Sequence, residues 1–413
     1  MAEKIVVAGI GMTRFGKFLE RGVRSLAEEA VQEAVKDAGL DAQDIQTAYF
    51  ANAVAGLITG QEMIRGQVAL RNTGILGIPI FNVENACASA ASAFHLAWMA
   101  VASGQYEVAL AVGSEKLYHE DKTRSFKAIG TAVDLERLAE LKKRMEETKA
   151  ATSTGSPAAS AAEAGQNRSF FMDIYASMTR EYMKASGATA EDFADVAVKN
   201  HDHGALNPKA QYRDRCSREQ VLQSREISAP LTLMMCSPIG DGAAAAILCS
   251  EKFARERGVR RPIQIRASVL LSGRDRNPDQ PGAVERAAES AYERAGIGPK
   301  DIDVIEVHDA ASPAELMAYE DLGLCERGGA PELLRSGATR LGGKHVVNPS
   351  GGLLAKGHPI GATGIAQIVE ICEQLRGNAA DRQVEGARIG LTENGGGFLG
   401  RDAAAMSVHV FAA

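Results

Sequence analysis

The sequence of 413 residues lacks three features that would assign it to a functional class at once. Its formal net charge is only -6, so no excess of charge favours a nucleic acid or a membrane surface as its partner. No uninterrupted apolar run reaches the about 20 residues that a membrane-spanning helix needs. The amino terminus enters an apolar run at Ile5 without the charged and then apolar pattern of a secretion signal. We therefore expect a soluble, cytoplasmic protein.

Cysteine is scarce, and its spacing excludes two kinds of framework. No two of the six cysteines form a Cys-x-x-Cys pair, so neither a zinc site nor a set of disulfides is predicted. The pattern therefore indicates no bound metal, and the thiols are expected to be reduced. The six are Cys87, Cys216, Cys236, Cys249, Cys325 and Cys372.

Glycine, in contrast, is abundant, with 42 residues. The glycines cluster in short motifs, which indicates tight turns and close approach of a ligand rather than disorder. Hydrophobic residues make up 45% and charged residues 24% of the chain, as in an ordinary globular protein. A chain of this length can form two or three domains with sizeable cores.

A repeated segment divides the chain into two related halves. Residues 34–45 align with residues 291–302 at a constant offset of 291 − 34 = 257, and alanine, glycine, aspartate and isoleucine recur in place. Chance similarity between alanine-rich helices is the alternative, but the order of strands and helices around the two copies also matches. Alternating strands and helices predict parallel sheets covered by helices, with a site where helix N-termini of the two halves converge.

Sequence of a different character separates the two halves. Residues 119–224 are expected to form an inserted loop or cap domain. The first half then comprises residues 1–118 and 225–258, and the second half comprises residues 259–413. Each half carries one copy of the repeat.

Within the insertion, three stretches are interpreted separately. Residues 133–145 carry an apolar stripe amid charges, which predicts an amphipathic surface helix or, as the alternative, a partner-binding surface. Residues 149–168 are rich in alanine, serine, threonine and glycine, so we expect a loop there. Residues 170–183 are predicted to be helical.

Cys87 lies where an extended segment gives way to a helix of small residues. Residues 81–85 precede it, and the run 88–93 begins a helix that ends at Gly104. The free N–H groups and the dipole at a helix N-terminus favour a thiolate, so we expect a lowered pKa for Cys87 and work as a nucleophile. The alternative is that Cys87 is only a small buried apolar residue.

Two histidines and a glutamate lie at strand ends or glycine-rich corners of the second half. His308 follows a buried strand, His358 lies within Gly-His-Pro-Ile-Gly-Ala-Thr-Gly at 357–364, and Glu393 precedes Asn-Gly-Gly-Gly. Strand carboxyl ends are where open α/β sheets place their sites. A single histidine is more often structural. A cysteine with one histidine to take its proton and another to bind an oxyanion, however, forms a coherent acyl-transfer set.

These motifs resemble those of the thiolase superfamily, and in particular the sterol-carrier-protein-type (lipid-transfer-protein-type) thiolases. Asn-Ala-Cys-Ala-Ser at 85–89 is similar to their nucleophile segment, Val-His-Asp-Ala at 307–310 to their histidine-aspartate motif, and 357–364 to their histidine motif. Residues 199–208 also resemble that subfamily, whereas the resemblance does not place residues 128–168. The resemblance implies an α/β thiolase fold, with two pseudo-symmetric α/β halves in a five-layered αβαβα arrangement and an inserted loop domain.

The resemblance implies a role for each candidate residue. Cys87 is acylated by a 3-oxoacyl-CoA or by acetyl-CoA, His358 activates its thiol, and His308 helps to bind an oxyanion. Ordinary thiolases have a second cysteine where this chain has Glu393, so Glu393 either moves the α-carbon proton or orients His358 or contacts the substrate. CoA is implied as a co-substrate, and no permanently bound cofactor is expected. The inserted region is expected to bind CoA together with Ser350, Gly351, Gly352 and Gly396.

Substrate and partners stay open at this point. The subfamily includes thiolases of fatty, sterol-side-chain and aromatic degradation, among them benzoylsuccinyl-CoA thiolase, whose large subunit this chain resembles. The resemblance implies at least a homodimer, and some members act with a small zinc-ribbon/OB-fold subunit. The preferred interpretation is cleavage of a 3-oxoacyl-CoA with CoA. The alternatives are a condensing or acyl-transferring enzyme, a retro-aldolase, or an inactive CoA- or lipid-binding protein.

Overall fold

The computed structural model describes residues 3–140 and 169–413, and the two copies of the repeat form equivalent units in it. One copy ends helix α1 (Val23–Ala38) and the other ends helix α12 (Ala283–Ala295). Each helix is closed by a glycine in the left-handed conformation, Gly39 or Gly296. Glycine adopts this conformation at little cost because it has no Cβ. The repeat in the sequence is therefore a helix, a glycine cap and the turn into the next strand.

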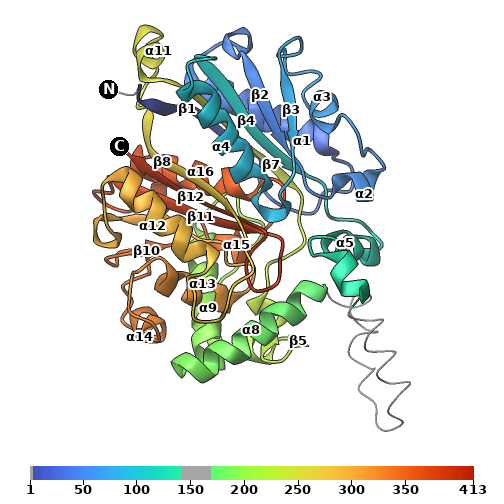
Figure 1. Cartoon of the computed structure of the whole chain (residues 1–413), viewed down its shortest axis with the longest axis vertical. Helices are drawn as coiled ribbons and strands as arrows, with labels where there is room; N and C mark the ends of the chain where they lie inside the picture. Colours follow the sequence, from blue (N-terminus) through green and yellow to red (C-terminus); the bar gives the residue numbers. More distant parts are fainter. Residues whose placement is uncertain (1–2, 141–168) are drawn as a thin grey trace.

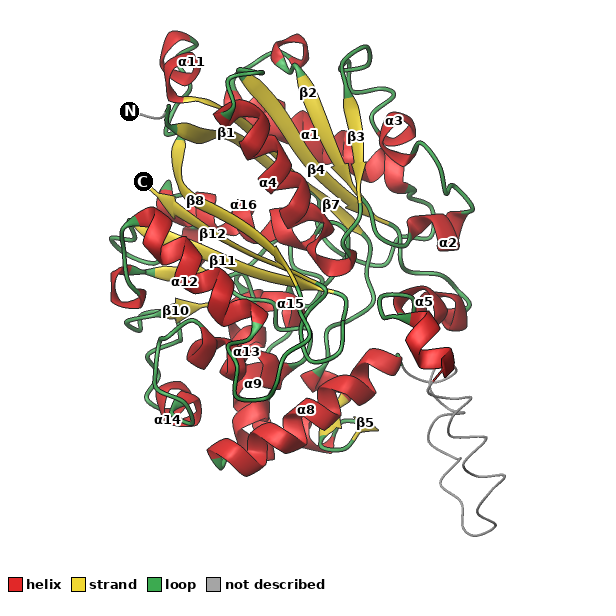
Figure 2. Ribbon diagram, viewed as in Figure 1, coloured by secondary structure: helices red, strands yellow, loops and turns green. Residues whose placement is uncertain are grey.

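Ten strands form a mixed sheet that consists of two equivalent halves (Figure 2). The strands of the first half are β1 (Ile5–Met12), β2 (Thr47–Ala51), β3 (Ile80–Val83), β4 (Val108–Glu115) and β7 (Gly242–Ser250). Those of the second half are β8 (Ile263–Ser272), β9 (Val304–Glu306), β10 (Val346–Val347), β11 (Ile389–Gly396) and β12 (Ala405–Ala412). Their order is β3-β2-β4-β7-β1 in one half and β10-β9-β11-β12-β8 in the other, so the two halves match strand for strand.

The prediction of parallel sheets is only partly confirmed. Strand β2 pairs in parallel with β3 and β4, and β9 pairs in parallel with β10 and β11. Strands β7 and β12, however, run antiparallel to both of their neighbours within their half. Strand β12 follows β11 after a short glycine-rich corner, and a short connection can only produce an antiparallel pair, because a parallel pair needs a long crossover.

Two helices lie between the half-sheets and form the middle of a five-layered arrangement (Figure 1). These are α4 (Ser89–Ala102), which follows Cys87, and α16 (Thr363–Leu375), which follows His358. Their buried residues share one core cluster with strands of both halves, whereas α1 and α12 cover the two outer faces. The predicted αβαβα order is thus confirmed, and it places the helices that follow Cys87 and His358 side by side.

The insertion contributes helices along one side of the molecule (Figure 1). They are α5 (Lys122–Ile129), α8 (Phe170–Ser186), α9 (Ala190–Ala205) and α10 (Arg218–Gln223). Helix α8 confirms the helix predicted over 170–183. Residues 135–140 are helical, whereas residues 133–134 precede the helix. Residues 141–145 of the predicted helix and the loop predicted over 149–168 lie outside the described residues. The division into three domains stays a prediction.

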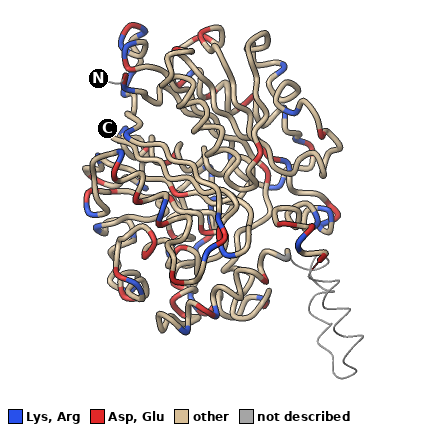
Figure 3. Tube along the Cα trace, in the orientation of Figure 1, with Lys and Arg blue, Asp and Glu red and all other residues tan. Residues whose placement is uncertain are grey.

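The remaining helices are divided between the two halves. Helices α2 (Ala55–Thr59), α3 (Arg65–Ala69) and α11 (Glu251–Glu256) lie in the first half, and α13 (Ser312–Asp321), α14 (Ala330–Arg335) and α15 (Gly352–Ala355) lie in the second half. Acidic and basic residues are interspersed along the described chain (Figure 3), as the small net charge predicts. Among the helices that the structure describes, none is both long and apolar enough to cross a membrane.

Candidate active site

Cys87 occupies the turn that opens α4. It lies in a 3-10 turn, Ala86–Ala88, directly before the α-helix, and Ala86 adopts a positive φ of 48°. The turn is held by Ser89, whose hydroxyl donates to the Ala86 carbonyl at 2.6 Å and accepts from the Asn85 N–H at 2.9 Å. The thiol is thereby placed at the helix N-terminus, as the small-residue run predicts, and it faces the second half of the molecule.

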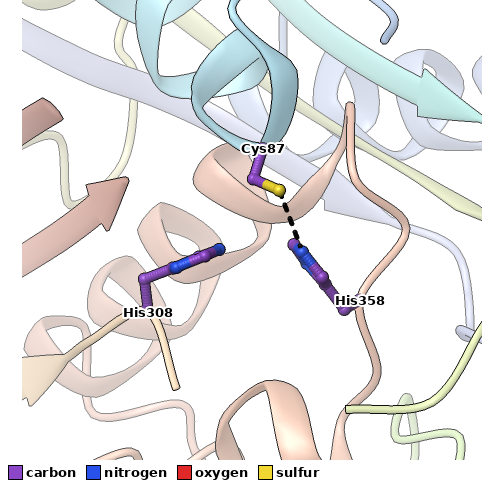
Figure 4. A group of neighbouring side chains, drawn as sticks. All are labelled: Cys87, His308 and His358. Atoms are coloured by element: carbon purple, nitrogen blue, oxygen red, sulfur yellow. Dashed lines mark hydrogen bonds between the residues drawn. The ribbon is translucent and has the colours of Figure 1, made fainter. Parts of the chain in front are cut away.

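His358 approaches Cys87 from the opposite half, with its Nε2 3.3 Å from the Cys87 Sγ (Figure 4). Its Nδ1 lies 2.7 Å from the hydroxyl oxygen of Thr363. The Thr363 hydroxyl donates to the carbonyl of Pro359 at 3.0 Å, so its oxygen is left to accept the proton on His358 Nδ1. The lone pair of Nε2 consequently points at the thiol, which is the tautomer that a proton acceptor for Cys87 requires.

The expectation that the Cys87 thiol has a lowered pKa is wrong. Burial, reinforced by the charge of Glu115, raises the pKa of Cys87 to about 12, although the N–H of Gly397 donates to the thiol and acts in the opposite direction. Burial lowers the pKa of His358 well below its ordinary value. Desolvation disfavours the charged form of both groups and outweighs the helix N-terminus. The resting pair is a neutral thiol beside a neutral imidazole.

His308 completes a group of three side chains that converge from distant segments (Figure 4). Its ring stands edge-on to that of His358, with the centroids 5.1 Å apart. Burial lowers the pKa of His308 to about 4, so its ring is neutral. Among the described residues its buried Nε2 has no hydrogen-bond partner. A buried polar atom without a partner is costly, and an oxygen of a bound substrate would satisfy it.

Glu393 lies within β11, in its carboxyl-terminal half, and is hydrogen-bonded to the backbone of His308. Its Oε2 accepts the His308 N–H at 2.8 Å, and its own carbonyl accepts from the side chain of Gln367 at 3.0 Å. Burial, reinforced by the charge of Asp321, raises the pKa of Glu393 to about 7. The carboxyl group therefore changes its protonation state near neutral pH, which suits a group that accepts and donates protons.

A buried polar network lies behind the three side chains and fixes the backbone that carries them. Asp309, next to His308, accepts from the N–H of Leu353 at 2.6 Å and from the Asn200 amide at 2.7 Å. Lys199 forms a fully buried ion pair with Glu315 at 2.8 Å. The segment 199–208, singled out in the sequence by family resemblance alone, therefore supports the His308 segment from α9.

The glycine-rich residues expected to bind CoA fall into two groups. Ser350, Gly351 and Gly352 are buried, and they do not line the cavity described below. The Ser350 hydroxyl donates to Glu306 at 2.7 Å. Contact of these three residues with CoA stays a prediction. Gly396 does line the cavity, and a Cβ on it would lie 2.5 Å from the N–H nitrogen of Ala88, so it also lets β11 approach the Cys87 turn.

A cavity of about 1610 Å³ opens in front of the candidate residues and contains Cys87, His308, His358 and Glu393 in its wall. This volume exceeds the about 300–1,000 Å³ of most small-molecule sites, so a long ligand fits. One wall is apolar and comes from α8, with Phe171, Met172, Ile174, Tyr175 and Met178. Basic side chains also line the cavity, namely Lys17, Arg65, Lys122, Arg215, Arg225, Arg276 and Arg401.

Sequence reasoning missed two residues of this site. Thr363 lies inside the predicted histidine motif, so its presence was noted but not its contact with His358. Tyr175 carried no signal in the sequence, because nothing in α8 marks one aromatic residue as facing Cys87 rather than the core. Its hydroxyl interacts electrostatically with Cys87 and Glu393 across the cavity.

Comparison with known proteins agrees with this geometry. The family model "Thiolase, N-terminal domain" matches residues 5–221, and "Thiolase C-terminal domain-like" matches residues 274–408. The chain is 40% identical over 412 residues to the acetyl-CoA acetyltransferase of Methanothermobacter thermautotrophicus, covering 98% of this chain and 99% of that protein. It is 37% identical over 410 residues to the benzoylsuccinyl-CoA thiolase subunit BbsB of Thauera aromatica, covering 97% of each.

Two further similarities support the same assignment. Sterol carrier protein 2 of Rattus norvegicus is 35% identical over 403 residues, which are 95% of this chain and 69% of that protein. A solved structure described as "Ltp2-ChsH2(DUF35) aldolase" superposes with a TM-score of 0.77 at 28% identity and covers 99% of this chain and 98% of that chain. The chain belongs to the thiolase family, and it is an acyltransferase of the thiolase type.

Proposed function

We propose that the chain cleaves a 3-oxoacyl-CoA with free CoA, and that Cys87 carries the acyl group between the two half-reactions. The observation that supports this proposal best is the 3.3 Å contact of Cys87 Sγ with His358 Nε2, because the bond from His358 Nδ1 to Thr363 leaves Nε2 able to accept the thiol proton. A nucleophile, a base and a group that orients the base are the recurring parts of covalent catalysis.

In the first half-reaction, the Cys87 sulfur bonds to the C3 carbonyl carbon while His358 Nε2 takes the thiol proton. The bond between C2 and C3 then breaks, which leaves an acyl-Cys87 thioester and the enolate of acetyl-CoA. The enolate carbon takes up a proton, and acetyl-CoA leaves. Since the resting thiol and imidazole are both neutral, the proton moves during the attack and not before it.

One group stabilises the negative charge that develops in these steps, and a second group transfers the proton. The unpartnered Nε2 of His308 donates a hydrogen bond to a substrate oxygen that becomes negative. Glu393, with a pKa raised to about 7, gives the proton to the enolate carbon and takes it back in the reverse reaction. In the second half-reaction the CoA thiol loses its proton to the Glu393 carboxylate and attacks acyl-Cys87. The departing Cys87 sulfur takes its proton back from His358, which restores the thiol and both groups.

The cavity wall supports a bulky apolar acyl group as the substrate class. Helix α8 offers phenylalanine, methionine and isoleucine side chains beside Cys87, and such a wall favours fatty, sterol-side-chain or aromatic acyl groups over short ones. Basic residues around the same cavity would meet the phosphates of CoA. CoA is in this proposal a co-substrate, held by the inserted region and by the corner at Gly396.

Partners are proposed from the sheet edge and from the relatives. Strand β3 is an edge strand, and Phe81 on it is 49% exposed, while Ile64 is 60% and Met63 is 77% exposed. An apolar sheet edge of this kind fits a second copy of the chain. The names of two relatives, a thiolase subunit and a DUF35-containing aldolase, support a small additional subunit of the zinc-ribbon/OB-fold kind. Native mass spectrometry of the purified protein would distinguish monomer, homodimer and mixed complex.

The test of the proposed function is intact-mass analysis after brief incubation with acetyl-CoA and with 3-oxoacyl-CoAs of increasing chain size. We expect a mass gain on the peptide that contains Cys87, its removal by free CoA, and neither in Cys87→Ala. Cys216→Ala is the matched control, because Cys216 lines the same cavity and is expected to leave the mass gain intact. Labelling that CoA does not remove would instead identify a condensing enzyme or an acyltransferase that does not carry out the thiolase cycle.

A further inference from the structure

Three potential metal ligands converge in the candidate site although no sequence spacing indicates them. One ligand atom each from Cys87, His308 and His358 lies within 4.8 Å of the other two. Tetrahedral zinc sites have Zn–S bonds of about 2.3 Å and Zn–N bonds of about 2.0–2.1 Å, so their ligand atoms lie about 3.3–3.6 Å apart. The distance of 3.3 Å from Cys87 Sγ to His358 Nε2 is close to these separations. The other two separations lie within 4.8 Å, so His308 has to approach Cys87 and His358 for all three to bind one ion.

The surroundings of the two histidines are those of metal ligands. A metal-bound histidine normally donates its other ring N–H to a fixed acceptor, and His358 donates its Nδ1–H to Thr363 at 2.7 Å. This bond holds the ring with the Nε2 lone pair aimed at the thiol. His308 binds a cation in the tautomer that carries its proton on Nδ1, and its buried Nε2 then gives up no hydrogen bond to a described residue. Binding therefore satisfies an atom that is otherwise unpartnered.

The charges near the group favour a cation. Glu115 and Glu84 both act electrostatically on Cys87, and Glu393 is hydrogen-bonded to the His308 backbone at 2.8 Å. A divalent cation bound to one thiolate and two neutral imidazoles keeps a single positive charge, which these carboxylates offset. Soft thiolate and imidazole ligands select zinc and its thiophilic relatives over magnesium or calcium.

We propose that Cys87, His308 and His358 form a binding site for Zn²⁺ or a similar thiophilic divalent cation, which blocks acyl transfer reversibly. The metal forms a bond to the Cys87 sulfur, the thiol proton passes to solvent, and no oxidation or reduction takes place. The fourth position faces the cavity and takes a water molecule. Binding itself is independent of the proposed function, whereas inhibition rests on it, because the same sulfur would be needed for acylation.

The experiment uses Co²⁺ as a spectroscopic probe added to the full-length, chelator-treated protein. We expect a thiolate-to-cobalt charge-transfer band and the visible bands of four-coordinate cobalt, both removed by excess Zn²⁺. Cys87→Ala should abolish the charge-transfer band, and His308→Ala and His358→Ala should each weaken Co²⁺ binding at least tenfold, about 1.4 kcal/mol. Circular dichroism checks that each variant is folded. If His308→Ala does not fold, His308→Gln replaces it in the measurement.

Cys216→Ala is the matched control, because Cys216 also lines the cavity beside His201 and Asp214, and it should keep the band. Zn²⁺ should in addition protect Cys87 from iodoacetamide, as read from the mass of its peptide, and a chelator should restore the labelling. Persistence of the band in Cys87→Ala, or no band in the wild type, would overturn the proposed site.

The same samples separate this proposal from the proposed function. A cobalt band in a protein that no thioester acylates would support the metal site and contradict the catalytic role of Cys87. Acylation of Cys87 in a protein that shows no cobalt band would contradict the metal site and leave the catalytic proposal supported. If both occur, Zn²⁺ at saturating concentration should lower the rate of acylation by acetyl-CoA at least tenfold, with recovery on chelation.

Discussion

Thr363 accepts the Nδ1 proton of His358 across 2.7 Å, and the direction of this bond decides which ring nitrogen faces Cys87. The direction follows from the next bond, in which the Thr363 hydroxyl gives its only proton to Pro359. Three residues of one motif, His358, Pro359 and Thr363, thus determine the tautomer of the proposed base. The histidine would otherwise be free to adopt the tautomer in which Nε2 carries a proton and cannot accept another.

Replacement of Thr363 by valine should therefore slow the acylation of Cys87. Loss of a buried hydrogen bond costs about 1–3 kcal/mol, so we expect a decrease of about 5- to 150-fold in the acylation rate, measured by rapid-quench mass analysis with acetyl-CoA. Thr363→Ser keeps the hydroxyl and should retain most of the rate. ¹⁵N NMR of the imidazole should show loss of the single tautomer in the valine variant only. Equal rates for the valine and serine variants would contradict the positioning role.

Glu393 should impose a pH dependence on the exchange of the acetyl-CoA methyl protons with solvent. Proton abstraction needs the carboxylate, and burial raises the pKa of Glu393 to about 7, so the ionised fraction grows as the pH rises through 7. We expect the exchange rate in deuterated water to fall about tenfold per unit below pH 7 and to level off above it. Glu393→Gln should lower the rate about 100-fold or more and remove this dependence.

Alkylation of Cys87 by iodoacetamide is the internal control for that variant, because it requires loss of the thiol proton to His358 and no proton transfer by Glu393. Glu393→Gln should still be alkylated at Cys87 within a few-fold of the wild-type rate. Near-normal exchange in the glutamine variant would rule out Glu393 as the group that moves the α-carbon proton, and would leave it the role of holding the His308 backbone.

Tyr175 should matter for turnover and not for stability. Its hydroxyl opens onto the cavity, and no hydrogen bond from it to another described residue is present. Tyr175→Phe should change the free energy of unfolding by less than about 0.5 kcal/mol while it lowers kcat/KM for a 3-oxoacyl-CoA about tenfold. Tyr182 on the same helix is the matched control, because its hydroxyl donates to Glu320 at 2.6 Å. Tyr182→Phe should lower stability and leave Cys87 acylation unchanged.

His409 should make the fold sensitive to acid. Burial lowers its pKa from 6.5 to about 3, and its Nδ1 is bonded to Ser268, which also contacts His95. The unfolded chain binds a proton below pH 6.5 and the folded protein does not, so stability is complete above that pH and is lost as the pH falls. The slope is about 1.4 kcal/mol per pH unit for one such group.

The measurement is the melting temperature of wild type and His409→Gln between pH 7.5 and about 5. The wild type should lose stability more steeply, although the pKa of His95, lowered by burial to about 4, adds its own contribution in both proteins. Parallel curves for the two proteins would show that His409 does not cause the acid sensitivity.

Local sequence patterns determined the fold to a large extent. The two alanine-rich helices end at Gly39 and Gly296 because each needs a residue in the left-handed conformation before the next strand. This requirement for glycine can be recognised in the sequence alone. The motifs around Cys87 and His358 were equally readable, because glycine and small residues are required wherever backbones approach closely. These features depend on short segments alone.

Only the tertiary structure decided the chemistry of the site. Cys87, His308 and His358 are brought together from three segments by the packing of α4, α16 and the end of β9, and no spacing in the sequence encodes a distance between them. Their pKa values depend on burial, and burial results from the packing of segments from the whole chain. A prediction from the helix N-terminus alone therefore gave a lowered pKa for Cys87, whereas burial raises it. The buried position of Ser350 and the position of Tyr175 in the cavity wall are likewise consequences of packing.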